Sequence, residues 1–178
     1  MSSKKIVITG GPGTGKTSLI NELIKRQHVC LEEISRQVIL EARKEGIDQL
    51  FLTNPMLFSE RLLESRMAQH QEANNLETSF VFIDRGVPDV LAYMDYANEA
   101  YPKSFIDACQ SCTYDQVFVL APWQEIFTSD SERYENFEQA IKIHEQLLNT
   151  YKKHGYQLID IPFDTIVNRV DFLLNTLK

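Results

Sequence analysis

Short apolar segments alternate with amphipathic segments along most of the chain. The apolar segments predict strands at residues 4–9, 29–32, 79–83, 116–120 and 156–161. Helical spacing of apolar residues predicts helices at about residues 16–26, 35–45, 55–74, 88–96, 103–111, 137–154 and 165–177. This alternation predicts one α/β domain over residues 1–178, built on a doubly wound, five-stranded parallel sheet. Functional residues are expected at the carboxyl ends of its strands.

Composition and charge exclude several classes of protein. Hydrophobic residues make up 43% of the 178 positions, enough for a sizeable core, which argues against intrinsic disorder. The formal net charge of −7 argues against a protein that coats nucleic acid. No apolar run approaches the ~20 residues that span a bilayer, so no transmembrane segment is expected. The absence of a signal-peptide core and an odd number of cysteines, three, favour a cytoplasmic location.

A glycine-rich motif follows the first predicted strand and opens the first predicted helix. Residues 10–17 fit the pattern G-x-x-x-x-G-K-[ST], in which backbone amides and a helix N-terminus surround phosphate oxygens. Lys16 is expected to be exposed and to reach the β- and γ-phosphates, and the Thr17 hydroxyl is expected to bind Mg²⁺. The expected nucleotide-binding residues are Gly11, Pro12, Gly13, Thr14, Gly15, Lys16, Thr17 and Ser18.

Asp84 ends the third predicted strand and is the expected second Mg²⁺-binding residue. The next residue is Arg85, whereas ATPases that activate a water usually carry a glutamate there. The fourth strand runs into Ala121-Pro122-Trp123 rather than the Asn-Lys-x-Asp of GTPases. These features disfavour a hydrolytic motor or a switch GTPase. ATP is therefore the expected nucleotide, with GTP as the alternative.

Several motifs together resemble one family. They are Ile8 to Thr17, Glu33-x-x-Arg36, Asp84-Arg-Gly-x-Pro-Asp89, Ala121-Pro-Trp123, Asp130-x-x-Arg133 and Ile161-Pro162. Over essentially the whole chain they resemble small AAA-type P-loop proteins of ATPase or kinase type. That family is similar to the nicotinamide-riboside kinase domain of bacterial NAD regulators and, more distantly, to deoxynucleoside and thymidylate kinases. The resemblance implies a nucleoside-kinase-like sheet of strand order 2-3-1-4-5.

The resemblance also implies an acceptor site. Glu33 occupies the place of the glutamate that contacts the acceptor hydroxyl and takes its proton, although Glu32 fits equally well on spacing alone. Arg36 and Arg85 resemble arginines that organise this site, and Arg85 is expected to pair with Glu33. Two further substrate-binding residues are expected. One is Asp89 of the Asp-Arg-Gly-x-Pro-Asp motif, and the other is Arg66, which faces the site if Leu63 and Met67 of the same long helix pack inward.

The segment of about residues 124–136 is expected to form a lid, and Arg133 is the only cation between Trp123 and Phe137. The expected catalytic residues are Lys16, Glu33, Asp84 and Arg133. The leading hypothesis is Mg²⁺- and ATP-dependent phosphoryl transfer to a hydroxyl of a small, nucleoside-like acceptor. The arginine-poor lid keeps an alternative open: a nucleotide-binding regulatory module, or a slow ATPase or GTPase, that binds a partner or a lipid headgroup.

Overall fold

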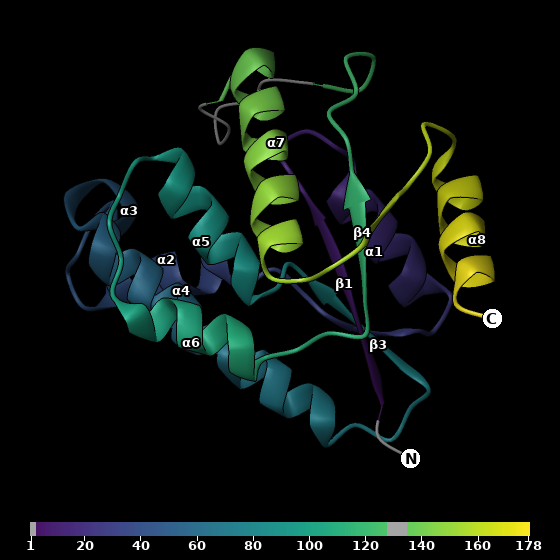
Figure 1. The fold of residues 1–178 in the computed structure, drawn as a ribbon, viewed down its shortest axis with the longest axis horizontal. Coiled ribbons are helices and arrows are strands. Elements are labelled where there is room, and N and C mark those ends of the chain that lie inside the picture. The colour runs from purple at the N-terminus through teal and green to yellow at the C-terminus, as the bar shows by residue number, and fades with distance from the viewer. Residues whose placement is uncertain (1–2, 128–134) are drawn as a thin grey trace.

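The computed structural model describes residues 3–127 and 135–178 (Figure 1). In chain order its elements are β1 (Lys4–Gly10), α1 (Lys16–Lys25), β2 (Val29–Leu31), α2 (Ser35–Lys44), α3 (Leu50–Thr53), α4 (Pro55–Asn74), β3 (Phe80–Asp84), α5 (Val87–Tyr96), α6 (Lys103–Ser111), β4 (Gln116–Leu120), α7 (Phe137–Lys153), β5 (Leu158–Asp160) and α8 (Ile166–Thr176).

The strands form one parallel sheet in the order β2-β3-β1-β4-β5. The doubly wound fold and the strand order expected from the sequence are therefore confirmed. In the β1–β3 pair, Ile8 lies opposite Asp84, so the glycine-rich loop after β1 and the acidic residue that ends β3 share one edge of the sheet. Because the strands are parallel, the segment after β2 reaches the same edge.

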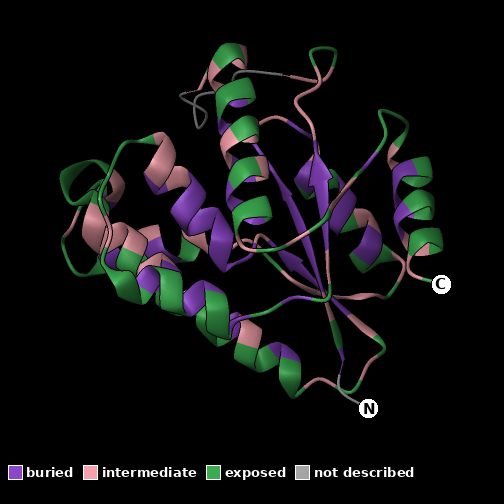
Figure 2. Cartoon of the chain, in the orientation of Figure 1, coloured by how far each residue is buried: buried purple, intermediate pink, exposed green. Residues whose placement is uncertain are grey.

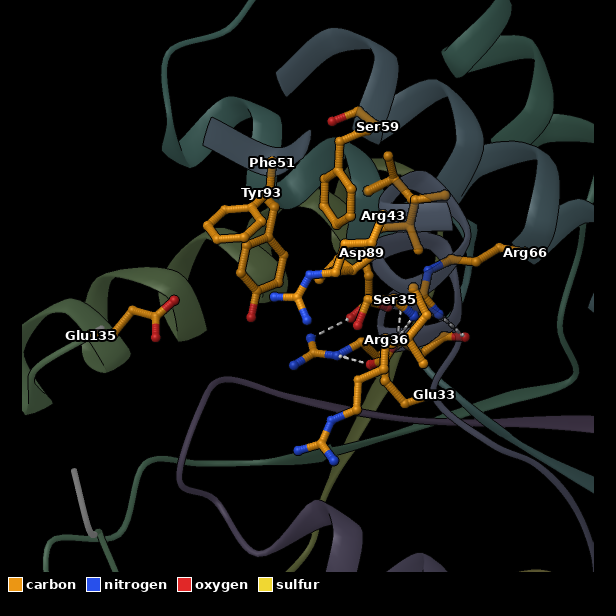
Figure 3. A pocket seen from close by; sticks show the side chains of 16 residues that line it. Glu33, Ser35, Arg36, Arg43, Phe51, Ser59, Arg66, Asp89, Tyr93 and Glu135 are labelled. Atoms are coloured by element: carbon orange, nitrogen blue, oxygen red, sulfur yellow. Dashed lines mark hydrogen bonds and ion pairs between the residues drawn. The ribbon is translucent and has the colours of Figure 1, made fainter. Parts of the chain in front are cut away.

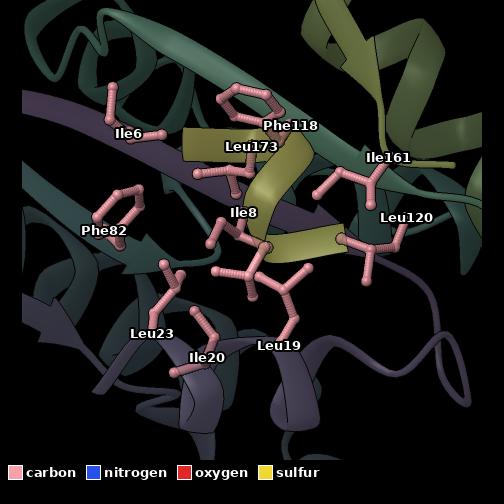
Figure 4. Close-up of a cluster of buried hydrophobic side chains, with 11 residues drawn as sticks. Ile6, Ile8, Leu19, Ile20, Leu23, Phe82, Phe118, Leu120, Ile161 and Leu173 are labelled. Carbon is pink, nitrogen blue, oxygen red and sulfur yellow. The ribbon is translucent and has the colours of Figure 1, made fainter. Parts of the chain in front are cut away.

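Alternate residues of each strand face opposite sides of the sheet, and helices cover both sides (Figure 2). Ile6 and Ile8 pack with Phe82 and Phe118 against α1 and α8, through the cluster drawn in Figure 4. On the other side, Val7 packs with residues of β3 and β4 against α4, α5 and α7. The two apolar layers fix the sheet between helices that come from distant parts of the chain.

Local sequence signals account for several helix ends. The Asn54 side chain accepts a hydrogen bond from the Leu57 amide, 3.1 Å away, and Pro55 occupies the first turn of α4. Gly46 and Gly155, at φ angles of 83° and 86°, follow α2 and α7 in the left-handed conformation that ends many helices. Helix α3, a single turn, was not predicted because four residues carry too little periodicity.

Two details concern the apolar faces of helices. Leu63 of α4 packs inward as expected, but Met67 is 37% exposed, so the apolar face of α4 was predicted too wide. Cys109 and Cys112 are buried beside α5 at the end of α6, and burial raises the pKa of Cys109 to about 12. Within the described residues, no helix combines the length and apolar character needed to cross a membrane.

Core packing predicts that substitutions of two phenylalanines differ strongly in their effect on the free energy of unfolding. Phe118→Ala should lower the free energy of unfolding by about 3–5 kcal/mol, because Phe118 is fully buried and its loss leaves a cavity in the core. Phe172 of α8 is 36% exposed, so Phe172→Ala should lower the free energy of unfolding by less than about 1 kcal/mol. Urea unfolding of both variants checks this, and equal losses would contradict the packing described here.

Candidate nucleotide and acceptor site

The glycine-rich loop links the end of β1 to the start of α1. The Thr14 hydroxyl donates a hydrogen bond to the Gly11 carbonyl over 3.0 Å, which closes the loop on itself. Gly13 and Gly15 have φ angles of 70° and 82°, in the region that side chains other than glycine rarely adopt. A Cβ on Gly13 would lie 2.5 Å from the ring of Phe127. The tight turn and the close approach of Phe127 both therefore require glycine at position 13.

Lys16 and Asp84 form an ion pair at the point where the loop meets the sheet. Lys16 is only 7% exposed and Asp84 only 3%, so the expectation of an exposed lysine was wrong. Burial and the nearby charge of Arg85 lower the pKa of Lys16, and the charge of Asp84 only partly offsets them. Thr17, one residue along α1, is exposed.

These groups fit Mg²⁺ and a nucleoside triphosphate. Glycine amides and the lysine ammonium suit phosphate oxygens, and the Thr17 hydroxyl and Asp84 carboxylate are oxygen ligands of the kind Mg²⁺ takes. Ser18, also exposed, follows in the first turn of α1, whose N-terminus adds a positive dipole. Pro12 lies in the loop between Gly11 and Gly13. The expected nucleotide-binding residues thus form one continuous segment.

Glu33 lies two residues before α2 and is held by two arginines. Its Oε1 is 2.9 Å from Arg66 Nη2, and its Oε2 is 2.7 Å from Arg85 Nε. Burial alone would raise the pKa of Glu33, but the charges of Arg66 and Arg85 outweigh it and hold that pKa well below its usual range. Arg66 also donates to the carbonyls of Asp84 and Arg85, each 3.1 Å away, which ties α4 to the end of β3.

Asp89 lies beneath this cluster, 2% exposed, on the first turn of α5. Its carboxylate receives hydrogen bonds from Thr9 at 2.6 Å and from Tyr151 at 2.5 Å, and it pairs with Arg85 at 3.1 Å. Arg85 itself has a φ of 72°, unusual for a residue with a Cβ. Asp89 thus anchors Arg85 and connects β1 with α7. Sequence reasoning missed Thr9 and Tyr151, which resemble ordinary core positions.

A cavity of about 800 Å³ opens beside Glu33 (Figure 3). It lies among α2, α3, α4 and α5, and its lining residues are Glu33, Ser35, Arg36, Ile39, Leu40, Arg43, Phe51, Phe58, Ser59, Leu62, Arg66, Arg85, Asp89, Val90, Tyr93 and Glu135. All the expected acceptor-site residues line it. Glu32 does not: it is exposed, and its carbonyl accepts a hydrogen bond from Gln69.

The cavity combines apolar walls with a charged end. Phe51, Phe58 and Tyr93 supply aromatic surfaces, and the carboxylate of Glu33 lies at the end nearest the sheet (Figure 3). A volume of this size suits a small molecule with a flat or apolar body. The Glu33 carboxylate, already paired with two cations, can accept a further hydrogen bond from a hydroxyl.

The expected lid extends over about residues 124–136, and its catalytic candidate, Arg133, lies outside the described residues. Of the described part, Phe127 packs against the glycine-rich loop and against Phe137 at the start of α7, with ring centroids 5.3 Å apart. The hypothesis that this segment closes over bound nucleotide remains a prediction.

The parallel sheet of order 2-3-1-4-5, with a phosphate-binding motif after its first strand, defines a P-loop protein of nucleoside-kinase-like fold. The family described as an AAA domain matches residues 5–169. The chain belongs to this family. A comparison with curated protein sequences finds no match.

Solved structures with the same fold cover nearly the whole chain. A NadR protein in complex with NR has a TM-score of 0.74 at 20% identity, over 98% of this chain and 50% of its own. Deoxyadenosine kinase from M. mycoides, with dCMP and dCDP bound, has a TM-score of 0.71 at 17% identity, over 97% and 98%. Thymidylate kinase from Candida albicans has a TM-score of 0.66 at 17% identity, over 99% and 91%. At these identities the likeness is one of fold.

The paired charges predict how stability depends on pH. Glu33→Gln should lower the free energy of unfolding at pH 7 by roughly 2 kcal/mol, because Arg66 and Arg85 lose a counter-ion. Since the pKa of Glu33 is lowered on folding, the unfolded chain takes up the proton first, near pH 4.3, about the ordinary value for glutamate. The stabilisation is therefore complete above that pH and is lost as the pH falls below it.

Urea unfolding between pH 7 and pH 3 checks this, with Glu32→Gln as a matched control. Glu32 is exposed and should change the stability little at any pH. The difference in stability between the wild type and Glu33→Gln should shrink as the pH falls toward 3. A difference that stays constant down to pH 3 would show that Glu33 does not contribute through its charge.

Proposed function

We propose that this protein transfers a phosphoryl group from Mg²⁺·ATP to a hydroxyl of a small, nucleoside-like acceptor. One observation carries the proposal. The phosphate-binding loop with Lys16 and Asp84 lies at the same edge of the sheet as Glu33, which faces a cavity of about 800 Å³. A donor site and an acceptor site side by side are what transfer between two small molecules requires. The fold shared with solved nucleoside and nucleotide kinases supports the proposal.

On the nucleotide side, the loop amides hold the phosphates and Lys16 moves from Asp84 onto them. Thr17 and Asp84 would hold Mg²⁺, which would supply positive charge to neutralise the phosphates. Release of Lys16 leaves the carboxylate of Asp84 free for that role. The Lys16–Asp84 ion pair therefore holds both side chains near the positions that nucleotide binding needs.

On the acceptor side, Glu33 acts mainly by orienting the hydroxyl. Its lowered pKa keeps it ionised at neutral pH, and for the same reason it is a weak base. A loose transition state demands little proton abstraction, so orientation of the hydroxyl in line with the γ-phosphate contributes more. Arg66 and Arg85 fix the carboxylate, and Asp89 fixes Arg85. The aromatic rings of Phe51, Phe58 and Tyr93 suit the base of a nucleoside-like acceptor.

Substitutions of the two acids should have different effects. Asp84→Asn is expected to weaken binding of Mg²⁺·ATP, because it removes a charge beside the metal. Glu33→Gln should change that affinity less than about threefold but slow acceptor-dependent turnover by roughly 100-fold, because the acceptor hydroxyl loses its orientation. Calorimetry with ATP, with and without Mg²⁺, measures the first effect. ADP release with a panel of nucleosides measures the second.

Equal losses of ATP affinity in both variants would assign Glu33 to the nucleotide site. Slow ADP release that no hydroxyl compound stimulates would instead favour the alternative, a nucleotide-binding regulatory module or slow ATPase or GTPase. In that case the cavity would hold a partner or a lipid headgroup.

Lys16→Ala should remove most ATP affinity, by roughly 100-fold or more, because a buried ammonium that reaches the phosphates is lost. Since Lys16 is buried against Asp84, the variant is also expected to be less stable without nucleotide. Lys25→Ala, at the exposed far end of the same helix, is the control and should bind ATP normally. Unchanged ATP binding by folded Lys16→Ala would contradict the assignment of the loop.

A further inference from the structure

Arg169 of α8 is fully buried, at 0% exposure. Its Nη1 and Nη2 both donate to the carbonyl of Thr14, at 3.2 and 3.3 Å. Its guanidinium carbon lies 5.9 Å from the centre of the Trp123 ring. A Cβ on Gly15 would come within 2.9 Å of Nη1. Arg169 is therefore packed directly against the phosphate-binding loop, from a helix more than 150 positions further along the chain.

The described residues around Arg169 do not balance its charge. Among residues 3–127 and 135–178, no carboxylate forms an ion pair with it, and its buried Nε has no hydrogen-bond acceptor. Burial lowers the pKa of Arg169, and no charge from the described residues opposes that effect. Buried arginines are normally paired, because an isolated buried charge is costly. This contrasts with Arg66 and Arg85, which share Glu33.

The geometry of the peptide bond gives this contact a consequence for phosphate binding. The carbonyl of Thr14 and the amide of Gly15 belong to one trans peptide, so they point in opposite directions. Arg169 holds the carbonyl, and the Gly15 N–H is thereby directed away from Arg169. In the described part of the chain, no backbone acceptor receives that N–H. A donor held in this way, and polarised by a charged partner, suits a phosphate oxygen.

We propose that Arg169 is a positioning residue of the phosphate-binding loop and that the phosphates of bound nucleotide balance its charge. It orients the Thr14–Gly15 peptide and contributes a buried positive charge behind the loop, without itself touching the nucleotide. The inference rests on the proposed nucleotide binding, but it does not depend on which acceptor is used or on whether transfer occurs. It makes α8, a helix outside the motifs, part of the nucleotide site.

The test compares Arg169→Met, which keeps the bulk and removes the charge, with Arg169→Lys, which keeps a charge. Arg26→Met is the matched control. Arg26, at the C-terminal end of α1, also contacts α8, but its charge is paired with Asp171. Calorimetry measures binding of ATP, ADP and AMP with Mg²⁺ and without acceptor, and thermal unfolding is measured without nucleotide. These readouts are independent of catalysis.

We expect Arg169→Met to weaken ATP binding tenfold or more, ADP binding less and AMP binding least. Its melting temperature without nucleotide should be no lower than that of the wild type, because an unbalanced buried charge is gone. Arg169→Lys should restore ATP affinity to within about threefold of wild type, and Arg26→Met should bind ATP normally.

Other outcomes overturn the inference. Arg169→Met that fails to fold, or that melts well below the wild type with normal ATP affinity, would assign Arg169 to structure alone. An equal loss for ATP, ADP and AMP would show that charge balance with the phosphates is not involved. If the wild type itself binds no ATP, the proposed function fails and this inference fails with it. If the wild type and Arg169→Met both bind ATP normally, this inference fails while the proposed function stands.

Discussion

Neutralisation of buried charge is the constraint on which the functional edge of the sheet depends. Lys16, Asp84, Arg66 and Asp89 are each less than 10% exposed, so water does little to stabilise their charges. Each must therefore meet an oppositely charged or hydrogen-bonding group held by the fold. Lys16 meets Asp84, and Arg66 meets Glu33 and two carbonyls. The arrangement of β1, β3, α4 and α5 is inseparable from these contacts.

Arg85 shows how far the backbone is adapted to this constraint. A left-handed conformation in a residue with a Cβ costs of order 1 kcal/mol, and such strain persists where surrounding contacts demand it. Here the conformation lets the main chain of Arg85 donate to Ile8 of β1 over 3.0 Å while its side chain joins Glu33 to Asp89. The charged contacts stabilise a conformation that the local sequence disfavours. Strain of this kind is characteristic of functional sites.

Periodicity and motif spacing were enough to predict the strands, most helices and the phosphate-binding loop. Strand order came from the resemblance, because the order of strands in a sheet is not encoded in local pattern. The sequence could not reveal that Lys16 is buried, since its burial depends on Asp84, 68 positions away. Arg169 was missed for a similar reason. It lies beside Val170 on an apolar helix face, where an isolated arginine gives no local signal.

The charges of the two halves of the site differ before any ligand binds. Within the described residues, the acidic and basic groups around Glu33 already pair with one another, whereas Arg169 adds a positive charge behind the loop that no carboxylate balances. The whole chain carries a formal charge of −7, which at long range repels a polyanion such as ATP. Salt screens that repulsion beyond about 8 Å, but it does not screen buried groups to the same degree. A local excess of positive charge around Lys16 and Arg169 attracts phosphate groups. The cavity beside Glu33 is lined by four arginines and three carboxylates, so its charges are close to balance, and it is better suited to recognition by shape and hydrogen bonds.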